Sequence, residues 1–461
     1  MIGKSARKEL ESYVFQRMSE SGIVGLSLAA VEDGEVSYNR GFGFRDFDRG
    51  TSSTPETTYC VGSVTKPFTA LAVMQLSERG LLGLDDPVER HVDFAAHPMG
   101  EPILVRHLLS HTSGLPSLGY AEVTLGMATD TTDEWYPIAS PRDLLVFMEG
   151  SEGWALAQPG TRHAYLNEGY ILLGAIIEKA SGVGYAEYVK RNILEPLQMR
   201  MSTFDEEDVE RDDDVATPYV TSREGEKVAT RYPYGQMIAD GGLMSNAMDM
   251  SRFVSALLSG GELDGARVAG AETIREMTEP KIRTAEEPYD GRGFHGYGYG
   301  LRVKESFLGR HLVYHSGSVY GSSGYMGLVP DEGVGVVVLA NGGYFLEDIG
   351  EYALALLMGR DHMEIPYFRR TRQLDDLAGT YTTFRDTSSY EVARSGGFLE
   401  LTMSFGTRTY TRPLIPVDLE GEPKEFRLYG LDAVTPVQFH RMGGETIMVY
   451  DRTMAKRRAY P

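Results

Sequence analysis

The apolar residues of this chain change their spacing several times between that of helices and that of strands. Helical spacing predicts helices over 6–20, 64–79, 142–149, 168–180, 185–195, 246–259, 270–278 and 347–358. Short runs rich in Val, Leu and Tyr, bounded by Gly, Pro and Asp turns, predict strands over 24–32, 35–44, 297–304, 311–316, 323–329 and 334–340. Asp33-Gly34 predicts a hairpin between the first two of these strands. The order predicts an α+β fold, an antiparallel sheet flanked by helices with a helical subdomain.

The remaining stretches of the first part have weaker patterns. Residues 102–116 predict a short helix that breaks into a turn, and 117–140 predict a loop, either a mobile cover for a cleft or a surface insertion. The acidic run 205–214 predicts a solvated loop. The range 64–79 is too apolar for a surface helix, so we expect it to be central and buried. Pro67 cannot donate a regular helical hydrogen bond and predicts an irregular first turn.

The composition shifts after residue 360. A charged stretch that contains Pro366 predicts a linker over 361–373, between a first domain at 1–360 and a second at 374–461. In the second domain, strand-like pieces recur at the spacing of a small β-barrel or sandwich. They lie at 379–384, 389–394, 397–403, 407–413, 425–428, 436–441 and 446–450.

Length and charge narrow the classes of function. The chain has 461 residues, 42% hydrophobic and 24% charged, an ordinary globular composition that is long enough for more than one core. A formal net charge of −21 disfavours binding to nucleic acid or anionic membranes, which require basic surface. We see no apolar segment of a signal peptide, and no apolar run approaches the roughly 18–20 residues of a membrane span. We therefore expect a cytoplasmic protein with no nucleic-acid or membrane partner.

Cysteine and histidine give little sign of a metal site. Cys60 is the only cysteine, which excludes an internal disulfide framework and a zinc site built from several cysteines. Its apolar surroundings predict a buried packing residue rather than a reactive thiol. His107 and His111 lie four residues apart and could face one metal, but no further clustered ligands accompany them. A structural role for both is therefore favoured.

Ser63 and Lys66 are the first candidates for chemistry. Residues three apart on a helix share a face, so the Ser63 hydroxyl can lie beside the Lys66 amine. A serine is a poor nucleophile until a base takes its proton, and a desolvated lysine can be that base. Ser5 and Lys8 have the same spacing in a charged segment that would not desolvate a lysine. The spacing alone is therefore weak and requires partners.

Two later motifs supply candidate partners. Tyr165-Leu166-Asn167 offers a phenol that can relay a proton and an amide that can contact Lys66 and a substrate carbonyl. A helix-capping Asn beside a core tyrosine is the alternative interpretation. His315-Ser316-Gly317-Ser318 ends a strand, and Gly317 would let a substrate approach the backbone closely. An ordinary histidine in a Ser/Gly turn at a strand end is the alternative here.

Together, in this order, the three motifs resemble those of the serine β-lactamase and penicillin-binding-protein superfamily, in particular its class C-like branch called CubicO. That branch includes esterases and D-amino-acid-specific peptidases. The resemblance covers about residues 8–358 and is reinforced by the stretches 106–116 and 240–243. No Gly-x-Ser-x-Gly motif is present, which disfavours an α/β-hydrolase.

The resemblance implies a role for each residue of the motifs. Ser63 would be the acylated nucleophile, Lys66 its base or proton relay, and Tyr165 the relay that protonates the leaving group. Asn167 would contact the substrate, and His315 would occupy the strand position next to Tyr165. The amides of Ser63 and Ser318 would form the oxyanion hole. Ser316 and Gly317 would line the substrate site. No metal or organic cofactor is implied.

His315 departs from the family pattern, which usually has Lys-Thr-Gly at this place. A lysine is a permanent cation that attracts a substrate carboxylate, whereas a histidine is mostly neutral near pH 7. Recognition of a free carboxylate, and β-lactam resistance as a role, are therefore disfavoured. We expect a serine hydrolase for small esters, amides or short peptides, including peptides with D-residues. The alternatives are transesterification at the same site and a catalytically silent binding or scaffold protein, which should have lost Ser63, Lys66 or Tyr165.

The C-terminal unit resembles the lipocalin-like barrels appended to some members of this group, particularly archaeal peptidases. Such a barrel would hold subunits of a homo-oligomer together or place a loop over a neighbouring cleft. A stabilising accessory domain is the other interpretation.

Overall fold

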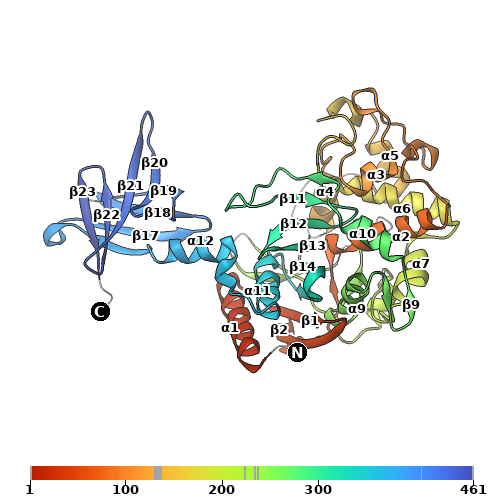
Figure 1. The fold of residues 1–461 in the computed structure, drawn as a ribbon, viewed down its shortest axis with the longest axis horizontal. Helices are drawn as coiled ribbons and strands as arrows, with labels where there is room; N and C mark the ends of the chain where they lie inside the picture. Colours follow the sequence, from red (N-terminus) through yellow and green to blue (C-terminus); the bar gives the residue numbers. More distant parts are fainter. Residues whose placement is uncertain are drawn as a thin grey trace. The chain divides into compact units, whose positions relative to one another are not determined.

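The computed structural model describes residues 3–128, 138–222, 225–232, 235, 238–405 and 407–458. The chain divides into two compact units, Met1–Arg360 and Asp361–Pro461 (Figure 1). None of the helices in these described ranges is both long and apolar enough to cross a membrane.

An antiparallel sheet of nine strands is the centre of the first unit. Its order is β10-β11-β12-β13-β14-β15-β1-β2-β3, so the N-terminal hairpin joins the late strands through β1 and β15, with Leu28 opposite Val338. Both faces of β1, β14 and β15 are buried, which explains their continuous apolar runs. The strands are β1 (Gly25–Glu32), β2 (Glu35–Asp46), β3 (Thr51–Ser52), β10 (Ile282–Arg283), β11 (His295–Tyr297), β12 (Arg302–Phe307), β13 (Arg310–Val319), β14 (Ser322–Val329) and β15 (Val334–Ala340).

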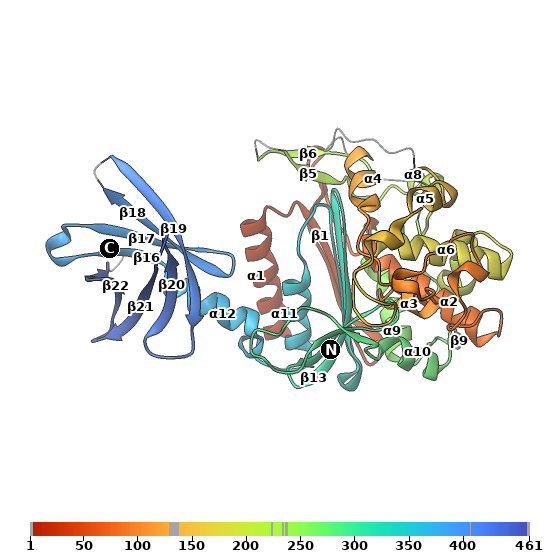
Figure 2. The ribbon, with the colours of Figure 1, turned by 90° about the horizontal axis from the view of Figure 1, so that it is seen from above.

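Helices cover both faces of this sheet. Figure 2 shows α1 (Lys4–Ser21) and α11 (Glu347–Leu357) on one side, and α9 (Ala247–Leu258) and α10 (Ala271–Thr278) on the other. The helical subdomain beyond them holds α2 (Lys66–Glu78), α3 (Val105–Leu109), α4 (Tyr120–Ala128), α5 (Pro141–Phe147), α6 (Asn167–Ser181), α7 (Tyr185–Val189) and α8 (Glu206–Glu210). This layered arrangement confirms the predicted α+β class.

Helix α2 is the buried helix that the sequence predicts. Every residue from Lys66 to Leu76 is buried, and Phe68 stacks on Phe253 of α9 with ring centroids 3.9 Å apart. Each fully buried side chain of this kind contributes about 1.5–3 kcal/mol. A 3-10 turn, Gly62–Thr65, precedes α2 and places Pro67 in the first turn of the helix. The expected irregular start is confirmed.

Three local predictions for the first unit are wrong. The range 297–304 is not one strand, because a turn at Gly298 to Leu301, with Gly300 at φ +75°, separates β11 from β12. The acidic run 205–214 contains α8, whose first turn is capped by the Asp205 carboxylate accepting from the amide of Glu207. The loop expected over 117–140 contains α4, and its acidic and aromatic positions at 129–137 lie outside the described residues.

Shorter elements complete the first unit. The expected helix over 185–195 continues from α7 as a π-turn, Lys190–Leu194. Three small sheets pair β4 (Tyr59–Cys60) with β7 (Met244–Ser245), β5 (Tyr219–Thr221) with β6 (Lys227–Ala229) and β8 (Glu262–Leu263) with β9 (Ala266–Arg267).

The second unit is a closed barrel of eight strands, which confirms the expected all-β barrel. Tyr381, Phe426 and Phe439 pack edge to face in its core. Most of the stretch 361–373 lies in a 3-10 turn, His362–Glu364, and in α12 (Pro366–Asp375). The strands are β16 (Gly379–Thr382), β17 (Ser389–Ser395), β18 (Phe398–Phe405), β19 (Arg408–Asp418), β20 (Lys424–Tyr429), β21 (Val434–Met442), β22 (Glu445–Tyr450) and β23 (Thr453–Arg457). The sequence pattern missed β23, which closes the barrel against β16.

Candidate active site

The Lys66 amine lies among three oxygen atoms. The side chain is fully buried, and its Nζ lies 3.0 Å from Ser63 Oγ, 2.8 Å from Asn167 Oδ1 and 2.8 Å from the carbonyl oxygen of Asp240. The two carbonyl oxygens can only accept, so they take two of the amine hydrogens. The third position on the nitrogen points at Ser63. There an ammonium donates to the hydroxyl, and a neutral amine accepts its proton.

Helix geometry and a second helix bring these groups together. Ser63 lies in the 3-10 turn and Lys66 begins α2, so the two are about one turn apart on continuous helical backbone. Asn167 begins α6, which packs beside α2. The N-cap position of α6 is occupied by Leu166, and the Asn167 side chain one residue later accepts from Lys66. The structure therefore contradicts the helix-capping interpretation of Asn167.

Tyr165 lies just before α6, with its ring facing the amine. Lys66 Nζ is 4.9 Å from the centre of this ring, and the Tyr165 side chain is partly exposed. The Arg302 guanidinium carbon lies 5.8 Å from the same ring. The Lys66 amine and the Arg302 guanidinium thus both face the Tyr165 ring, which is an arrangement suited to proton transfer between the phenol and the amine.

His315 is buried beside this cluster and points at another tyrosine. Its Nδ1 lies 2.7 Å from the carbonyl oxygen of Ser316, and its Nε2 lies 3.0 Å from the Tyr297 hydroxyl. A carbonyl can only accept, so Nδ1 carries the hydrogen. Burial, with Arg302 and Lys66 nearby, lowers the pKa of His315 well below its usual value. The neutral ring therefore accepts a hydrogen bond from the Tyr297 hydroxyl at Nε2, and its centre is 6.4 Å from that of Tyr165.

Strand β13 touches the turn that carries Ser63, and two glycines permit this contact. A Cβ on Gly317 would lie 2.1 Å from Val61 O and 2.6 Å from Ser63 N, and a Cβ on Gly62 would lie 2.8 Å from Ser318 N. We expected glycine at 317 to let a substrate approach the backbone. The structure shows instead that the protein's own backbone at Val61 and Ser63 occupies this space. The amides of Ser63 and Ser318 belong to these two facing segments, and Ser316 is half-buried next to them.

Arg302 is a charged member of the site that sequence reasoning missed. Its Nη1 lies 3.2 Å from both carboxylate oxygens of Glu286, and its side chain is 22% exposed. Burial disfavours the charge, but Tyr314 and Glu286 outweigh it and raise the pKa of Arg302. The position of Arg302 on a predicted strand gave no signal of this role, whereas Asp240 lay within a stretch that resembles the family.

Two buried carboxyl groups belong to residues next to this cluster, since Asp240 also gives its carbonyl to Lys66 and Glu168 follows Asn167 in α6. Burial raises the pKa of Asp240 to about 6, although Lys66 opposes the shift. Burial also raises the pKa of Glu168 to about 7, where Glu168 Oε1 accepts from the amide of Tyr120 and Oε2 finds no hydrogen-bond partner among the described residues. Both groups therefore titrate near neutral pH.

His107, His111 and Cys60 have packing or backbone roles. His107 Nδ1 accepts from the amide of Leu104, and His111 Nδ1 accepts from the amide of Leu166. Within the ranges that the structure describes, no three His, Cys, Asp or Glu side chains gather as metal ligands. Cys60 is buried, as predicted, and burial raises the pKa of its thiol to about 11.

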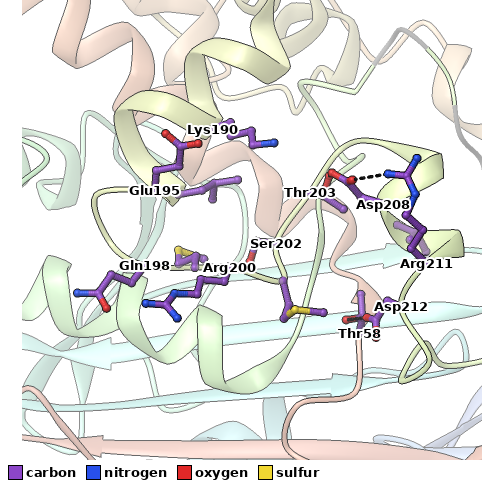
Figure 3. Close-up of a pocket in the computed structure, with 14 residues that line it drawn as sticks. Thr58, Lys190, Glu195, Gln198, Arg200, Ser202, Thr203, Asp208, Arg211 and Asp212 are labelled. Atoms are coloured by element: carbon purple, nitrogen blue, oxygen red, sulfur yellow. Dashed lines mark hydrogen bonds and ion pairs between the residues drawn. The ribbon is translucent and has the colours of Figure 1, made fainter.

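A surface cavity of about 620 Å³ lies apart from these residues (Figure 3). Its wall includes Leu194, Met199 and Val209, and none of the residues around Ser63 lines it. The dashed lines in Figure 3 mark pairs within the wall, such as Thr58 with Asp212 at 2.7 Å. Such pairs fasten the segment around α8 to the rest of the first unit.

Comparison with known proteins identifies the family. A family model described as beta-lactamase matches residues 10–358. The chain belongs to this family. A second model, described as the Pab87 octamerisation domain, matches residues 362–454. The two matches confirm the superfamily that the ordered motifs resemble and the presence of an appended C-terminal domain.

Solved structures of the family resemble the chain to different extents. The octameric penicillin-binding protein homologue from Pyrococcus abyssi is 41% identical to this chain, with a TM-score of 0.90. The match covers 98% of this chain and 99% of the homologue's chain. EstCE1, described as a hydrolase with promiscuous acyltransferase activity, is 25% identical over 77% of this chain and 98% of its own, with a TM-score of 0.62. A D-stereospecific amidohydrolase from Streptomyces is 26% identical over 74% of this chain and 95% of its own, with a TM-score of 0.59. The chain spans 64% of the length of curated relatives that are 26% identical to it.

Proposed function

We propose that this member of the beta-lactamase family is a serine hydrolase that forms an acyl-enzyme on Ser63. The observation that carries the proposal is the Lys66 amine, buried among Ser63 Oγ, Asn167 Oδ1 and the carbonyl of Asp240. An amine without access to water and aimed at a hydroxyl is suited to take its proton. A merely structural lysine would not require a serine as its third partner.

The proposed reaction uses the neighbouring groups in turn. Ser63 Oγ attacks the substrate carbonyl carbon while its proton passes to Lys66 or Tyr165. The amides of Ser63 and Ser318 stabilise the oxyanion, and Tyr165 returns a proton to the leaving atom as its bond to carbon breaks. Water then hydrolyses the acyl-enzyme. His315 would act indirectly in this scheme, by holding Tyr297 and the end of β13 next to Tyr165.

The proposed substrates are small amides, short peptides and esters, including peptides with D-residues. The relative described as a D-stereospecific amidohydrolase supports the D-configuration. Arg302 supplies the fixed positive charge that His315, neutral and buried, lacks. An anionic group on the substrate would compete with Glu286 for that guanidinium.

Acyl transfer to an alcohol is the second candidate, and the relative EstCE1 supports it by its description. The same acyl-enzyme would then be attacked by an alcohol instead of water. Product analysis of an ester substrate with added alcohol distinguishes the two. A new ester as the main product supports transfer, and free acid alone supports hydrolysis.

The test of the main proposal is covalent labelling. A fluorophosphonate should add to Ser63 of the full chain, as identified by mass spectrometry of peptides, and should not add to Ser63→Ala. Ser63→Ala should also lose ester and amide hydrolysis, whereas Ser5→Ala should retain both because Ser5 lies near the start of α1. Full activity of Ser63→Ala would refute the proposal.

We further propose that the chain forms a homo-oligomer through residues 361–461. The support is the match of 362–454 to an octamerisation domain and the octameric relative that covers 98% of this chain.

A further inference from the structure

His111 holds the segment of Tyr165 from both sides. The carbonyl oxygen of His111 accepts from the amide of Ala164 at 2.8 Å, and its ring Nδ1 accepts from the amide of Leu166 at 3.0 Å. Ala164 and Leu166 are the two chain neighbours of Tyr165. One residue therefore fixes the backbone directly before and directly after the phenol.

The His111 ring also packs directly on the Tyr165 ring. Their centres are 4.0 Å apart with an angle of 33° between the planes. Tyr170 and Tyr297 close the other sides of the imidazole, with centres 5.0 Å and 4.7 Å away. The imidazole is 1% exposed, so it is held firmly and in turn limits the positions open to Tyr165.

Two features of His111 are unfavourable for stability. Its φ of +54° lies in the left-handed region, which non-glycine residues rarely adopt. Nδ1 accepts a hydrogen bond, so the neutral ring carries its hydrogen on Nε2, and this buried Nε2 has no hydrogen-bond partner among the described residues. A residue retained for packing alone would not need this combination of strain and an unsatisfied donor. The combination indicates a residue selected for its geometry.

We propose that His111 is a positioning residue that holds the Tyr165 hydroxyl where it can protonate the leaving group. The inference rests on the proposed function and names a residue that acts through Tyr165. In the step concerned, the bond from carbon to the leaving nitrogen breaks, its electron pair stays on nitrogen, and nitrogen takes the Tyr165 proton. The tyrosinate is then reprotonated by the ammonium form of Lys66, which holds the proton taken from Ser63.

The test compares two leaving groups on one acyl group. An anilide nitrogen needs a proton to leave, whereas p-nitrophenolate leaves from an ester without one. Replacing His111 with Leu removes the acceptor for Leu166, so kcat for the anilide should fall about 100-fold. The kcat for the ester should fall only a few-fold, and KM for both should change little. His111→Asn keeps an acceptor and tolerates a positive φ, so it should restore most of the anilide activity.

A double-mutant cycle and a matched control complete the experiment. Tyr165→Phe should cause the same selective loss, and combining it with His111→Leu should add little, because His111 acts through Tyr165. His163→Leu removes a half-buried imidazole whose ring centre lies 5.9 Å from that of His111, and which is not the acceptor for the amides of Ala164 and Leu166, so it should spare the anilide reaction. Equal losses of ester and anilide activity in His111→Leu, or additive losses in the double mutant, would overturn the proposal.

Folding and the parent proposal are tested separately. Circular dichroism and the melting temperature show whether His111→Leu is folded, and the Asn variant carries the test if it is not. Fluorophosphonate labelling of Ser63 in every variant reports on the acyl-enzyme. Absence of labelling in the unmodified chain would refute the proposed function. If Ser63 is still labelled in His111→Leu but ester and anilide activity fall equally, only the role of His111 is refuted.

Discussion

Lys66 is the residue on which the proposed chemistry of the site depends most. A fully buried amine would be costly without partners, and here three oxygen atoms surround it. Two of these are carbonyl oxygens that orient the nitrogen, and the third belongs to Ser63. The same contacts that make burial of the amine tolerable therefore aim it at the hydroxyl.

Replacing Lys66 with Met keeps the length and apolar character of the stem and removes the amine. We expect kcat to fall at least about 10³-fold for ester and amide, because the amine that lies 3.0 Å from Ser63 Oγ and can take its proton is removed. Steady-state kinetics with the melting temperature measured alongside checks this. Lys281→Met is the control, since Lys281 lies over the Tyr299 ring outside the site and should retain activity.

Glu168 makes stability depend on pH. Burial, with Asp240 and Glu122 adding, raises the pKa of its carboxyl from 4.5 to about 7 in the folded chain. Between these values the folded state binds more protons than the unfolded state, so stability should fall as pH rises from about 4.5 to 7 and change no further above it. The loss at pH 8 should be about 1–3 kcal/mol.

Glu168→Gln cannot ionise, and its amide oxygen can still accept from Tyr120. Chemical unfolding at pH 4.5, 6 and 8 should therefore show a flatter profile and greater stability than the unmodified chain at pH 8. The control Glu210→Gln, at an exposed position, should leave the dependence of stability on pH unchanged. Identical slopes for the Glu168 variant and the unmodified chain would contradict the assignment.

At the scale of elements, the site depends on how closely β13 approaches the turn before α2. The backbone of Gly317 faces Val61 O and Ser63 N with no room for a Cβ between them. Because both neighbours are backbone atoms, neither can rotate away. The two segments that carry the Ser63 and Ser318 amides therefore have a separation set by glycine.

Gly317→Ala should force these segments apart and disturb both amides. We expect kcat to fall about 100-fold or more and the melting temperature to drop. Gly343→Ala is the matched control, since a Cβ there meets no atom within 4 Å. Unchanged kinetics for Gly317→Ala would show that the oxyanion is stabilised elsewhere.

At the scale of the whole molecule, the chain joins a hydrolase-like unit to a closed barrel. A closed barrel has no free strand edge, so any contact between barrels must use side chains on its outer surface or its loops. Leu431 is fully exposed in the loop between β20 and β21, and Tyr429 and Val434 beside it are half-exposed. Such exposed apolar residues are typical of a surface that another protein covers.

Removal of residues 361–461 should reduce the mass of the assembly in solution. Light scattering of the full chain should give a multiple of 51.0 kDa, and the shortened chain a smaller multiple or a monomer. Fluorophosphonate labelling of Ser63 in both forms controls for loss of the first unit. An unchanged number of subunits after deletion would remove the barrel from the interface.

Local information in the sequence was enough to predict most helices and strands and the pairing of Ser63 with Lys66. Helical and strand spacing identified α2, α6, α9 and the strands β13 to β15, because such patterns depend on residues only a few positions apart. Ser63 and Lys66 were identified for the same reason, since one helical turn brings them together. Two local features differ from the prediction: the turn with its glycines within 297–304 divides one predicted strand, and the capped helix α8 replaces a predicted loop. Neither changes the class of fold.

Tertiary structure alone decided which distant groups meet. The approach of Asp240 O to Lys66, the orientation of Arg302 toward Tyr165, and the pairing of His315 with Tyr297 each require elements far apart in the chain to pack in one way. A one-dimensional pattern does not specify such contacts, because they depend on the relative placement of whole helices and strands. The sequence by itself thus determined the candidate nucleophile, the amine beside it and the resemblance to the family, whereas the three-dimensional packing decided what orients these groups and what lies against Tyr165.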